Sequence, residues 1–331
     1  MNLNMKAIFQ KNVELAPFTT FKIGGKADYF CKVNNLKELK TALKEAKKMN
    51  QPIFILGGGS NILVSDEGFR GIVVKNQNSK MTLRGVQQGS KIQNDKLKFK
   101  IFCEAGILLS QLVAKSLEIG ATGLEWAIGI PGTVGGAICG NSGAYGKNLG
   151  EITKKVQVLN LKTLTLKNYS HRDCQFGYRE SIFKKIPCVI LSAVLELKKG
   201  SAFASRQLIQ AYLEQRKSKI PPHPSAGSVF KNIEINKKLS PKLKEIASQF
   251  KKFGKIPAGY LIESCGLKGK RIGGAEISKQ HANFIVNINK AKARDVLALI
   301  NLCKKEVKRK FGVELQEEAK LVGFNYIASL M

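Results

Sequence analysis

A glycine-rich segment directly behind an apolar run is the first part of this chain that could do chemistry. The four apolar residues Ile53–Leu56 are followed by Gly57, Gly58, Gly59, Ser60 and Asn61. Glycines have no Cβ, so their backbone N–H groups can approach a phosphate, and Ser60 and Asn61 can add side-chain donors. The segment lacks the GxGxxG spacing of a Rossmann fingerprint. On its own it therefore fits both a phosphate-binding loop and an ordinary tight turn.

A second glycine-rich segment lies far along the chain, between Ile130 and Gly146. Its residues with binding potential are Gly132, Thr133, Gly135, Gly136 and Asn141. A flexible linker would be polar, whereas this segment mixes its glycines with apolar residues. Two such loops can hold one extended dinucleotide from two sides. The pair therefore predicts a dinucleotide cofactor.

The elements that must position these loops can be predicted from periodicity and turn residues. Apolar residues at helical spacing predict helices over Leu36–Met49, Leu108–Leu117, Leu208–Leu213, Pro257–Cys265 and Val296–Phe311. Apolar or alternating runs predict strands over Ile53–Leu56, Gly71–Lys75, Val156–Leu166, Cys188–Leu197 and Asn283–Asn289. Helices interspersed with strands over 331 residues predict an α+β protein of two or three domains, with a boundary at the proline cluster Pro221, Pro222 and Pro224.

Composition limits the classes of protein that the chain can be. With 44% hydrophobic residues it can bury a sizeable core, which excludes an intrinsically disordered chain. Lysine and arginine number 55 against 24 acidic residues, for a net charge of +31. The excess is mostly lysine, spread along the chain, and no nucleic-acid-binding module is recognisable. We interpret it as solvated surface and anionic small ligands, with a basic nucleic-acid-binding protein as the alternative from another class.

Other features argue against metal sites, disulfides and membrane spans. The 7 cysteines are scattered without a CxxC pair, and His171 and His223 have no metal-ligand spacing with each other or with any cysteine. We therefore expect free thiols and no metal, and we interpret His281 as a packing histidine. No apolar run approaches the roughly 18 residues of a membrane span, and Met1–Gln10 has no hydrophobic signal core. We expect a soluble, cytoplasmic protein.

A series of segments in chain order resembles one known family. The segments are Thr19–Gly25, Gly57–Val64, Gly123–Glu125 with Ile130–Ala137, Gly177–Arg179, Ser225–Asn232, Gly266–Asn287 and Glu314–Gly323. They resemble the UDP-N-acetylenolpyruvoylglucosamine reductases of the shorter subgroup, because no room is evident before Ser228 for the tyrosine-bearing insertion. The first segments would also suit other flavoproteins of the vanillyl-alcohol-oxidase type. Another FAD-linked oxidoreductase of that superfamily is therefore the alternative within the enzymes.

The resemblance implies a two-lobed FAD-binding domain of the vanillyl-alcohol-oxidase type, followed by a smaller α+β substrate-binding domain. The expected ranges are 1–75 for lobe 1, 76–220 for lobe 2, 221–318 for the substrate-binding domain and 319–331 for a C-terminal tail. The implied activity is NADPH-dependent reduction of UDP-N-acetylglucosamine enolpyruvate to UDP-N-acetylmuramate, through tightly but non-covalently bound FAD, in peptidoglycan precursor synthesis. The protein would be a monomer that binds no specific nucleic acid.

The resemblance also assigns three catalytic residues. Ser228 would donate the proton, although a serine beside a glycine is by itself typical of a turn, and its hydroxyl is a weak acid without stabilising neighbours. Arg179 would bind the substrate carboxylate through its guanidinium fork, where the alternative is a surface ion pair. Glu318 would complete the site, protonated or sharing a proton. Glu314 and Glu317 lie close enough in the chain to be the alternatives for that role.

Binding residues are assigned in the same way. Arg216 and Lys219 would lie near the UDP phosphates, where the alternative is a basic helix end. Lys231 and Asn232 would contact the substrate, and Lys231 would help to stabilise the serine alkoxide. Lys320 stands where the family usually has an arginine, which keeps the charge but loses the bidentate fork. The FAD would be held by Gly57, Gly58, Gly59, Ser60, Asn61, Gly132, Thr133, Gly135, Gly136 and Asn141.

Overall fold

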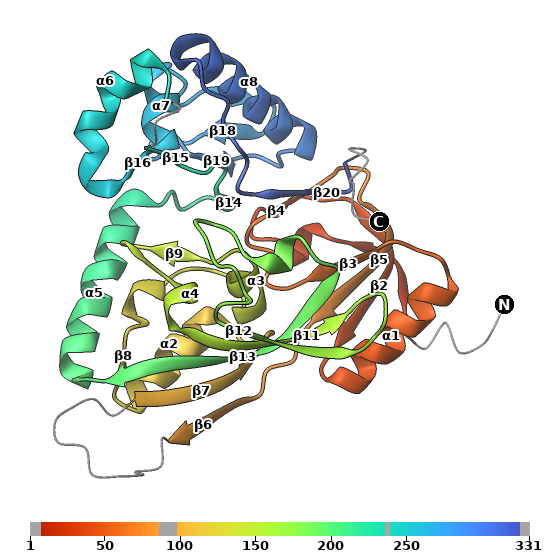
Figure 1. The fold of residues 1–331 in the computed structure, drawn as a ribbon. Helices are drawn as coiled ribbons and strands as arrows, with labels where there is room; N and C mark the ends of the chain where they lie inside the picture. Colours follow the sequence, from red (N-terminus) through yellow and green to blue (C-terminus); the bar gives the residue numbers. More distant parts are fainter. Residues whose placement is uncertain (1–7, 86–97, 236–238, 325–331) are drawn as a thin grey trace.

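The computed structural model describes residues 8–85, 98–235 and 239–324. Residues 1–7, 86–97, 236–238 and 325–331 lie outside the described residues, and so do the parts of the expected lobes and tail that fall on them. The described chain contains three larger sheets, which we call the N-terminal, middle and C-terminal sheets (Figure 1). No helix in these ranges combines the length and the apolarity needed to cross a membrane.

The N-terminal sheet has the strand order β1-β2-β5-β3. Its strands are β1 Gln10–Glu14, β2 Lys26–Val33, β3 Ile53–Leu56 and β5 Phe69–Asn76. Strands β2, β5 and β3 are parallel, and Ile72, Val73 and Val74 of the central β5 are fully buried, as expected for a parallel strand covered on both faces. Helix α1 (Leu36–Lys48) packs against β2 and β5. Its first turn is capped by Asn35, whose side chain accepts a backbone N–H three residues on.

The middle sheet is antiparallel, with the order β12-β11-β13-β7-β6 and with β8 also paired to β13. Its strands are β6 Met81–Gly85, β7 Lys98–Glu104, β8 Ala121–Thr122, β11 Thr153–Asn160, β12 Leu166–Ser170 and β13 Cys188–Lys199. The helices and hairpin of this part are α2 Leu109–Glu118, α3 Val134–Cys139, β9 Gly143–Ala144, β10 Lys147–Asn148, α4 Leu149–Ile152 and α5 Ala202–Lys219. Fully buried Trp126 lies in their shared core. Helix α5 then carries the chain to the C-terminal part (Figure 1).

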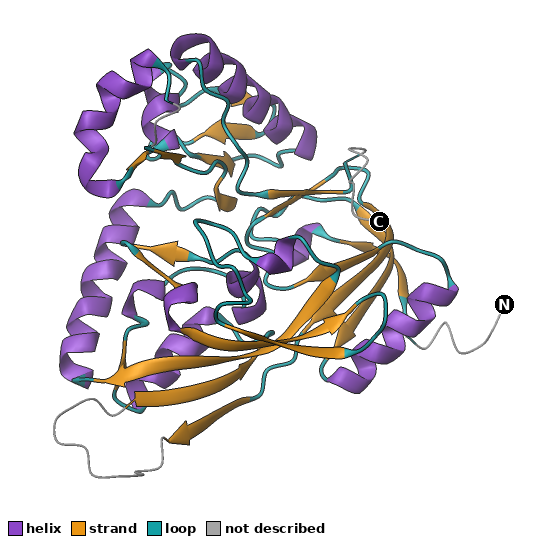
Figure 2. Cartoon of the chain, in the orientation of Figure 1, coloured by secondary structure: helices purple, strands orange, loops and turns teal. Residues whose placement is uncertain are grey.

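The C-terminal sheet has the order β14-β19-β18-β17, and Figure 2 shows helices gathered around it. Its elements are β14 Ser225–Ser228, α6 Pro241–Phe250, α7 Ala258–Ser264, β17 Arg271–Ile272, β18 Ala275–Ile277, β19 Phe284–Asn287 and α8 Ala293–Phe311. A small hairpin joins β15 Ile233–Glu234 to β16 Lys255–Ile256. Helix α8 buries one apolar stripe and ends at Gly312, whose φ of +67° is the left-handed geometry that glycine adopts without strain.

After α8 the chain returns to the N-terminal part. Strand β20 (Lys320–Val322), which lies within the expected C-terminal tail, pairs in parallel with β4 (Ile62–Val64). Just before it, Glu317 forms an isolated bridge with Phe230 of the C-terminal part. The segment between α8 and β20 therefore runs between two parts of the molecule, and the first glycine-rich segment lies directly before β4.

The predicted helices are confirmed as α1, α2, α5, α7 and α8, and most predicted strands are also present. Two local predictions differ. Val156–Leu166 is not one strand but parts of β11 and β12, because Asn160 begins a turn that is closed by its backbone hydrogen bond with Thr165. The second glycine-rich segment is not all loop, since α3 begins within it at Val134. Short 3₁₀ helices span Ala16–Phe18, Glu125–Ala127, Ile182–Lys184 and Lys251–Phe253.

Candidate active site

The two glycine-rich segments lie against each other, between the N-terminal and middle sheets. Ser60 Oγ donates a hydrogen bond to the carbonyl oxygen of Pro131, at 2.9 Å. A Cβ on Gly58 would lie 2.6 Å from Gly132 Cα, closer than real Cβ contacts come. Glycine is needed here because two backbones approach each other directly. The fold thus brings together the two loops that the sequence analysis paired.

Backbone donors of the first loop have no acceptor among the described residues. The N–H groups of residues 57–61 follow the carboxyl end of β3, and none of them is hydrogen-bonded to another residue in the part of the chain that the structure describes. The carbonyl oxygen of Gly57 accepts a hydrogen bond from Lys75 Nζ at 2.8 Å, and burial lowers the pKa of this lysine. A row of free N–H donors beside a cation fits a diphosphate. These residues therefore fit the phosphate portion of FAD.

The rest of the second segment is packed into the middle part. A Cβ on Gly135 would lie 2.7 Å from the Ala105 Cβ, whereas Gly136 is exposed. Asn141 is buried; its Nδ2 donates to the carbonyl oxygen of Gly177, and its Oδ1 accepts an N–H of α4, both at 2.8 Å. The side chain of Asn141 therefore supports a turn of the protein itself. Cofactor contacts of these residues stay predictions.

Arg179 and Glu318 come together across the boundary between the middle and C-terminal parts. Arg179 lies at the tip of a tight turn closed by two backbone hydrogen bonds between Gly177 and Glu180, of 3.0 and 3.2 Å. Its φ is +56°, and its Nε lies 2.7 Å from Glu318 Oε1. This buried Nε–H has no aligned hydrogen-bond acceptor among the described residues, so the contact with Glu318 is an ion pair rather than a linear hydrogen bond. The remaining guanidinium N–H groups can therefore bind a second carboxylate.

The surroundings of Glu318 make this carboxyl easier to protonate than an ordinary glutamate. Burial raises the pKa of this carboxyl above its ordinary value, and the Arg179 cation opposes the shift without cancelling it. The alternatives Glu317 and Glu314 pair instead with lysines of α8, at 2.9 and 3.4 Å. Of these three glutamates, the structure therefore places only Glu318 against Arg179.

Ser228 is held beside the Glu318 segment by backbone contacts. It ends β14 directly after Gly227, whose φ is +78°. The Glu318 N–H donates to the carbonyl oxygen of Val229 at 2.7 Å, so the segments of Ser228 and Glu318 are neighbours. Buried Asn283 fixes the same stretch from the other side, with Phe230 N–H donating to its Oδ1 at 3.0 Å and its Nδ2 donating back at 2.9 Å.

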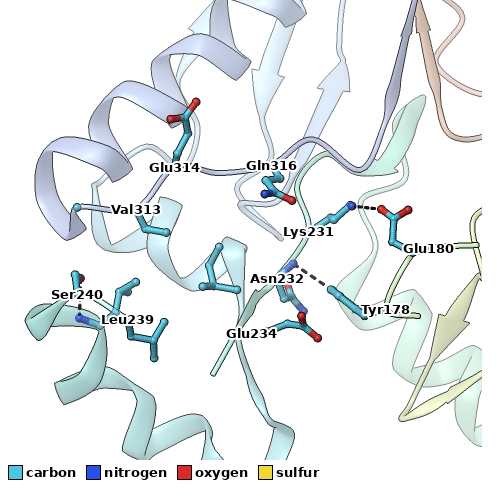
Figure 3. A pocket seen from close by; sticks show the side chains of 13 residues that line it. Tyr178, Glu180, Lys231, Asn232, Glu234, Leu239, Ser240, Val313, Glu314 and Gln316 are labelled. Carbon is cyan, nitrogen blue, oxygen red and sulfur yellow. Dashed lines mark hydrogen bonds and ion pairs between the residues drawn. The ribbon is translucent and has the colours of Figure 1, made fainter. Parts of the chain in front are cut away.

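The predicted substrate residues Lys231 and Asn232 line a cavity of about 470 Å³ (Figure 3). Lys231 Nζ lies 2.5 Å from Glu180 Oε1, and Asn232 N–H donates to Tyr178 Oη at 3.2 Å. Burial raises the pKa of Tyr178, so its hydroxyl stays neutral. Arg179, Ser228 and Glu318 do not line this cavity. It therefore adjoins the predicted catalytic residues without containing them.

Arg216 and Lys219 lie in the last turn of α5. Arg216 Nη2 donates to the carbonyl oxygen of Gly129 at 2.9 Å, and burial lowers the pKa of its guanidinium. Its neighbour Tyr145 stacks on Tyr212, with ring centroids 4.3 Å apart. Lys219 is exposed at the helix end. The structure thus places Arg216 against the second glycine-rich segment and leaves Lys219 in solvent, and a role for either with phosphates stays a prediction.

His281 and the cysteines have ordinary structural surroundings. The Nδ1 atom of His281 accepts the Asn283 N–H at 3.2 Å, and burial lowers the pKa of its ring. All seven cysteines are free thiols, and most are buried. Among the described ranges no group of three or more His, Cys, Asp or Glu side chains could hold a metal ion.

Three residues near the site were missed as contributors by the sequence analysis. Tyr178 and Glu180 flank Arg179 and contact the C-terminal part, and Asn283 supports the Ser228 segment. Asn283 could have been found as a polar residue at the start of an apolar strand. Nothing in the local sequence signals the partners of Tyr178 and Glu180, since these lie more than fifty residues away in the chain.

The fold and the glycine cradle define an FAD-binding protein with an added C-terminal domain. Residues 27–166 match the family model of an FAD binding domain. Residues 218–322 match the model described as UDP-N-acetylenolpyruvoylglucosamine reductase, C-terminal domain. The predicted α+β fold with a two-lobed FAD-binding part is thereby confirmed.

Individual relatives agree with both models. The UDP-N-acetylenolpyruvoylglucosamine reductase of Synechococcus sp. (strain JA-3-3Ab) is 39% identical over 95% of this chain and 91% of its own. That of Clostridium novyi is 36% identical over 98% and 96%. The crystal structure of the enzyme from Thermus caldophilus, 30% identical, superposes with a TM-score of 0.71 over 95% of this chain and 100% of that chain. The chain belongs to the UDP-N-acetylenolpyruvoylglucosamine reductase family, which confirms the predicted resemblance.

Proposed function

We propose that this protein reduces UDP-N-acetylglucosamine enolpyruvate to UDP-N-acetylmuramate, with NADPH as the source of reducing equivalents, in the cytoplasmic synthesis of peptidoglycan precursors. The observation that carries the proposal is the Arg179–Glu318 pair at 2.7 Å, held beside the Ser228 segment. FAD, when bound, supplies hydride chemistry that no side chain can perform. The free N–H groups of residues 57–61 and the Lys75 cation would hold its diphosphate.

The side chains fit the electronic demands of this reduction. Hydride addition to the vinyl group leaves negative charge on the carbon bearing the carboxylate, and that charge spreads into the carboxylate as an enolate. Arg179 would stabilise it with its guanidinium, and a protonated Glu318 would donate a hydrogen bond to it. Ser228 would then deliver the proton to carbon. The raised pKa of Glu318 supports this arrangement, because a neutral carboxyl does not repel the substrate carboxylate.

The nucleotide portion of the substrate would be bound by the remaining predicted residues. Lys231 and Asn232 line the cavity beside the pair, and Arg216 lies in the last turn of α5, where its guanidinium contacts the Gly129 carbonyl. We propose the domain ranges 1–75, 76–220, 221–318 and 319–331, a monomeric state, and no specific nucleic-acid partner. The substrate cleft would then lie between the two FAD-binding lobes and the substrate-binding domain.

The proposal is tested by the two half-reactions of the purified protein. We expect a yellow protein that releases FAD on denaturation, is bleached by NADPH, and is reoxidised without oxygen by UDP-N-acetylglucosamine enolpyruvate with formation of UDP-N-acetylmuramate, detected by mass spectrometry. A flavoprotein that NADPH reduces but this substrate does not reoxidise would favour another FAD-linked oxidoreductase. A colourless protein that FAD cannot reconstitute would contradict the proposed FAD-dependent function.

A further inference from the structure

The turn that carries Arg179 is rigidly attached to the middle part. Its two ends are joined by hydrogen bonds between Gly177 and Glu180, and Asn141 Nδ2 donates to the Gly177 carbonyl at 2.8 Å. The next residue, Ser181, donates its hydroxyl proton to the Cys139 carbonyl at 2.7 Å. The backbone of Glu180 is therefore held by the middle part and not by the substrate-binding part.

Lys231 reaches this carboxylate from the opposite side. Its backbone N–H donates to the carbonyl oxygen of Gln316 at 2.9 Å, within the pairing that also holds Glu318. Its ammonium lies 2.5 Å from Glu180 Oε1, and the two side chains point toward one another in Figure 3. Their exposed fractions are 19% for Lys231 and 38% for Glu180, so the pair is open to solvent and to ligands. Lys231, which the sequence analysis assigned to the substrate, is thus already paired with Glu180 in the substrate-free protein.

Glu180 has a second cation in reach. Lys184 Nζ lies 3.8 Å from the same Oε1 atom. Partial burial tends to raise the pKa of Glu180, but the hydrogen bond from Lys231 and the charges of nearby lysines outweigh it, and the net pKa is lowered. Glu180 therefore stays ionised, and it keeps a counter-ion when Lys231 leaves. Breaking the pair does not leave an uncompensated charge, which is what makes the loss of a buried ion pair costly.

We propose that Glu180 is a positioning residue that holds Lys231 in the substrate-free protein and releases it to an anionic group of the nucleotide-sugar substrate. This inference rests on the function proposed above. A partly exposed pair between two side chains contributes little stability, whereas an ammonium–phosphate contact is a charge-assisted hydrogen bond to a stronger anion. The exchange therefore favours binding, and the Glu180–Lys231 contact lowers substrate affinity by the free energy needed to break it.

The test is a calorimetric titration of oxidised holoenzyme with UDP-N-acetylglucosamine enolpyruvate. We expect Glu180→Gln to bind the substrate about two- to fivefold more tightly than the parent, because a partly exposed ion pair contributes little more than an exposed one. We expect Lys231→Met to bind more weakly, and Glu180→Gln to have no further effect in that background. Flavin reduction by NADPH, measured on each variant, reports that the protein is folded and carries its cofactor.

Glu245→Gln is the matched control for the removal of one negative charge. Glu245 lies on α6, is exposed, does not line the cavity, and forms no ion pair within the described residues. Unchanged binding in this variant would support the inference. Equal tightening in Glu245→Gln, no tightening in Glu180→Gln, or a Glu180→Gln effect that persists with Lys231→Met would each overturn it. A parent holoenzyme that shows no binding and no reoxidation would overturn the proposed function as well, so the two failures are distinguishable.

Discussion

At the scale of single residues, the site depends on side chains held in unusual conditions by their surroundings. Arg179 keeps a φ of +56°, which is uncommon for a residue with a Cβ, because the turn hydrogen bonds on both sides of it leave no alternative. Glu318 is a carboxyl whose pKa is raised by burial despite an adjacent guanidinium. Both conditions cost stability, and both concentrate where the proposed reaction needs a cation and a protonatable acid.

The role of Ser228 can be separated from cofactor chemistry. Ser228→Ala should keep near-normal flavin reduction by NADPH, because that half-reaction needs no proton for the substrate. Reoxidation by the enolpyruvyl substrate should fall by at least about 100- to 10,000-fold, the contribution typical of a general acid. Stopped-flow flavin absorbance measures both steps, with Ser248→Ala on the exposed face of α6 as a control. Reoxidation at the parental rate would return Ser228 to the role of a turn residue.

The protonation of Glu318 gives the reaction a pH dependence. Because burial raises its pKa, the neutral form persists to higher pH than for an ordinary glutamate, and the reoxidation rate should fall as pH rises through that raised pKa. The same sign holds for stability: the contribution of the protonated group is present at low pH and is lost as pH rises through the folded-state pKa. Single-turnover reoxidation rates measured across pH should show this fall, the alkaline limb of the profile, in the parent and lack it in Glu318→Gln. An unchanged limb in the variant would assign it to another group.

At the scale of elements, two carboxylates each join a helix to a segment that lies far away in the chain. Asp66, in the turn behind β4, accepts the first N–H groups of α8, from Ala293 at 2.7 Å and from Arg294 at 3.0 Å. A carboxylate there also complements the positive end of the helix dipole. Glu125, in the 3₁₀ helix Glu125–Ala127 of the middle part, accepts from the side chains of Thr122 on β8 and Ser205 on α5. These contacts keep α8 and α5 in place relative to the loops that they flank.

Removing the Asp66 cap should destabilise the protein. Asp66→Ala leaves two N-terminal N–H groups of α8 without their acceptor, which should lower the free energy of unfolding by about 1 kcal/mol. Urea denaturation measures the change. Asp28→Ala, which removes an exposed ion pair with Arg70, is the control and should change stability much less. Equal losses would contradict a capping role.

Glu125 should make stability fall at low pH. Burial raises the pKa of this carboxyl, but hydrogen bonds from Ser205, Thr122 and the Gly123 N–H outweigh it, so the net pKa is lowered. A lowered carboxyl pKa adds stability above the unfolded-state pKa, and that stability is lost as pH falls through the folded-state value. Glu125→Gln should lose about 1–3 kcal/mol near neutral pH and less in acid. Thermal unfolding from pH 7 downward should show the two proteins converging; a constant gap would contradict this.

At the scale of the whole molecule, the ion pairs of the site affect how the parts are placed, whereas the surface charge affects solubility and the encounter with anions. The turn at residues 177–180 joins the middle and C-terminal parts through Arg179 and Glu180, so the geometry of the site depends on how these parts are placed. The net charge of +31 is distributed over the chain and is not concentrated in one element. Such a charge affects solubility and encounter with anions rather than fold.

The charge leads to a prediction about nucleic acids. If the lysines serve solubility and anionic small ligands, DNA binding should be weak and independent of sequence. It should decline by orders of magnitude between about 50 and 200 mM salt, because it would depend on counterion release alone. Fluorescence anisotropy with two unrelated duplexes over this range is the measurement. A complex that prefers one duplex and persists at about 200 mM salt would instead support a nucleic-acid function.

The sequence by itself determined the local features of the protein, because these depend only on residues that are neighbours in the chain. The apolar residues at helical spacing predicted α1 and α8, because helical periodicity is a local property of the sequence. The glycine loops could be found for the same reason, since the absence of Cβ is visible in the sequence. The family resemblance added the roles of Arg179, Ser228 and Glu318, which no local pattern reveals.

Only the tertiary structure decided which of these residues meet. Glu314, Glu317 and Glu318 are equivalent by spacing, and the pairing of their segment with Val229–Lys231 turns Glu318 alone toward Arg179. The helix α3 forms inside a glycine-rich segment because packing against Ala105 outweighs the low helix propensity of glycine. Ion pairs, burial and pKa shifts are properties of contacts between residues distant in the chain, and these contacts exist only once the sheets have packed.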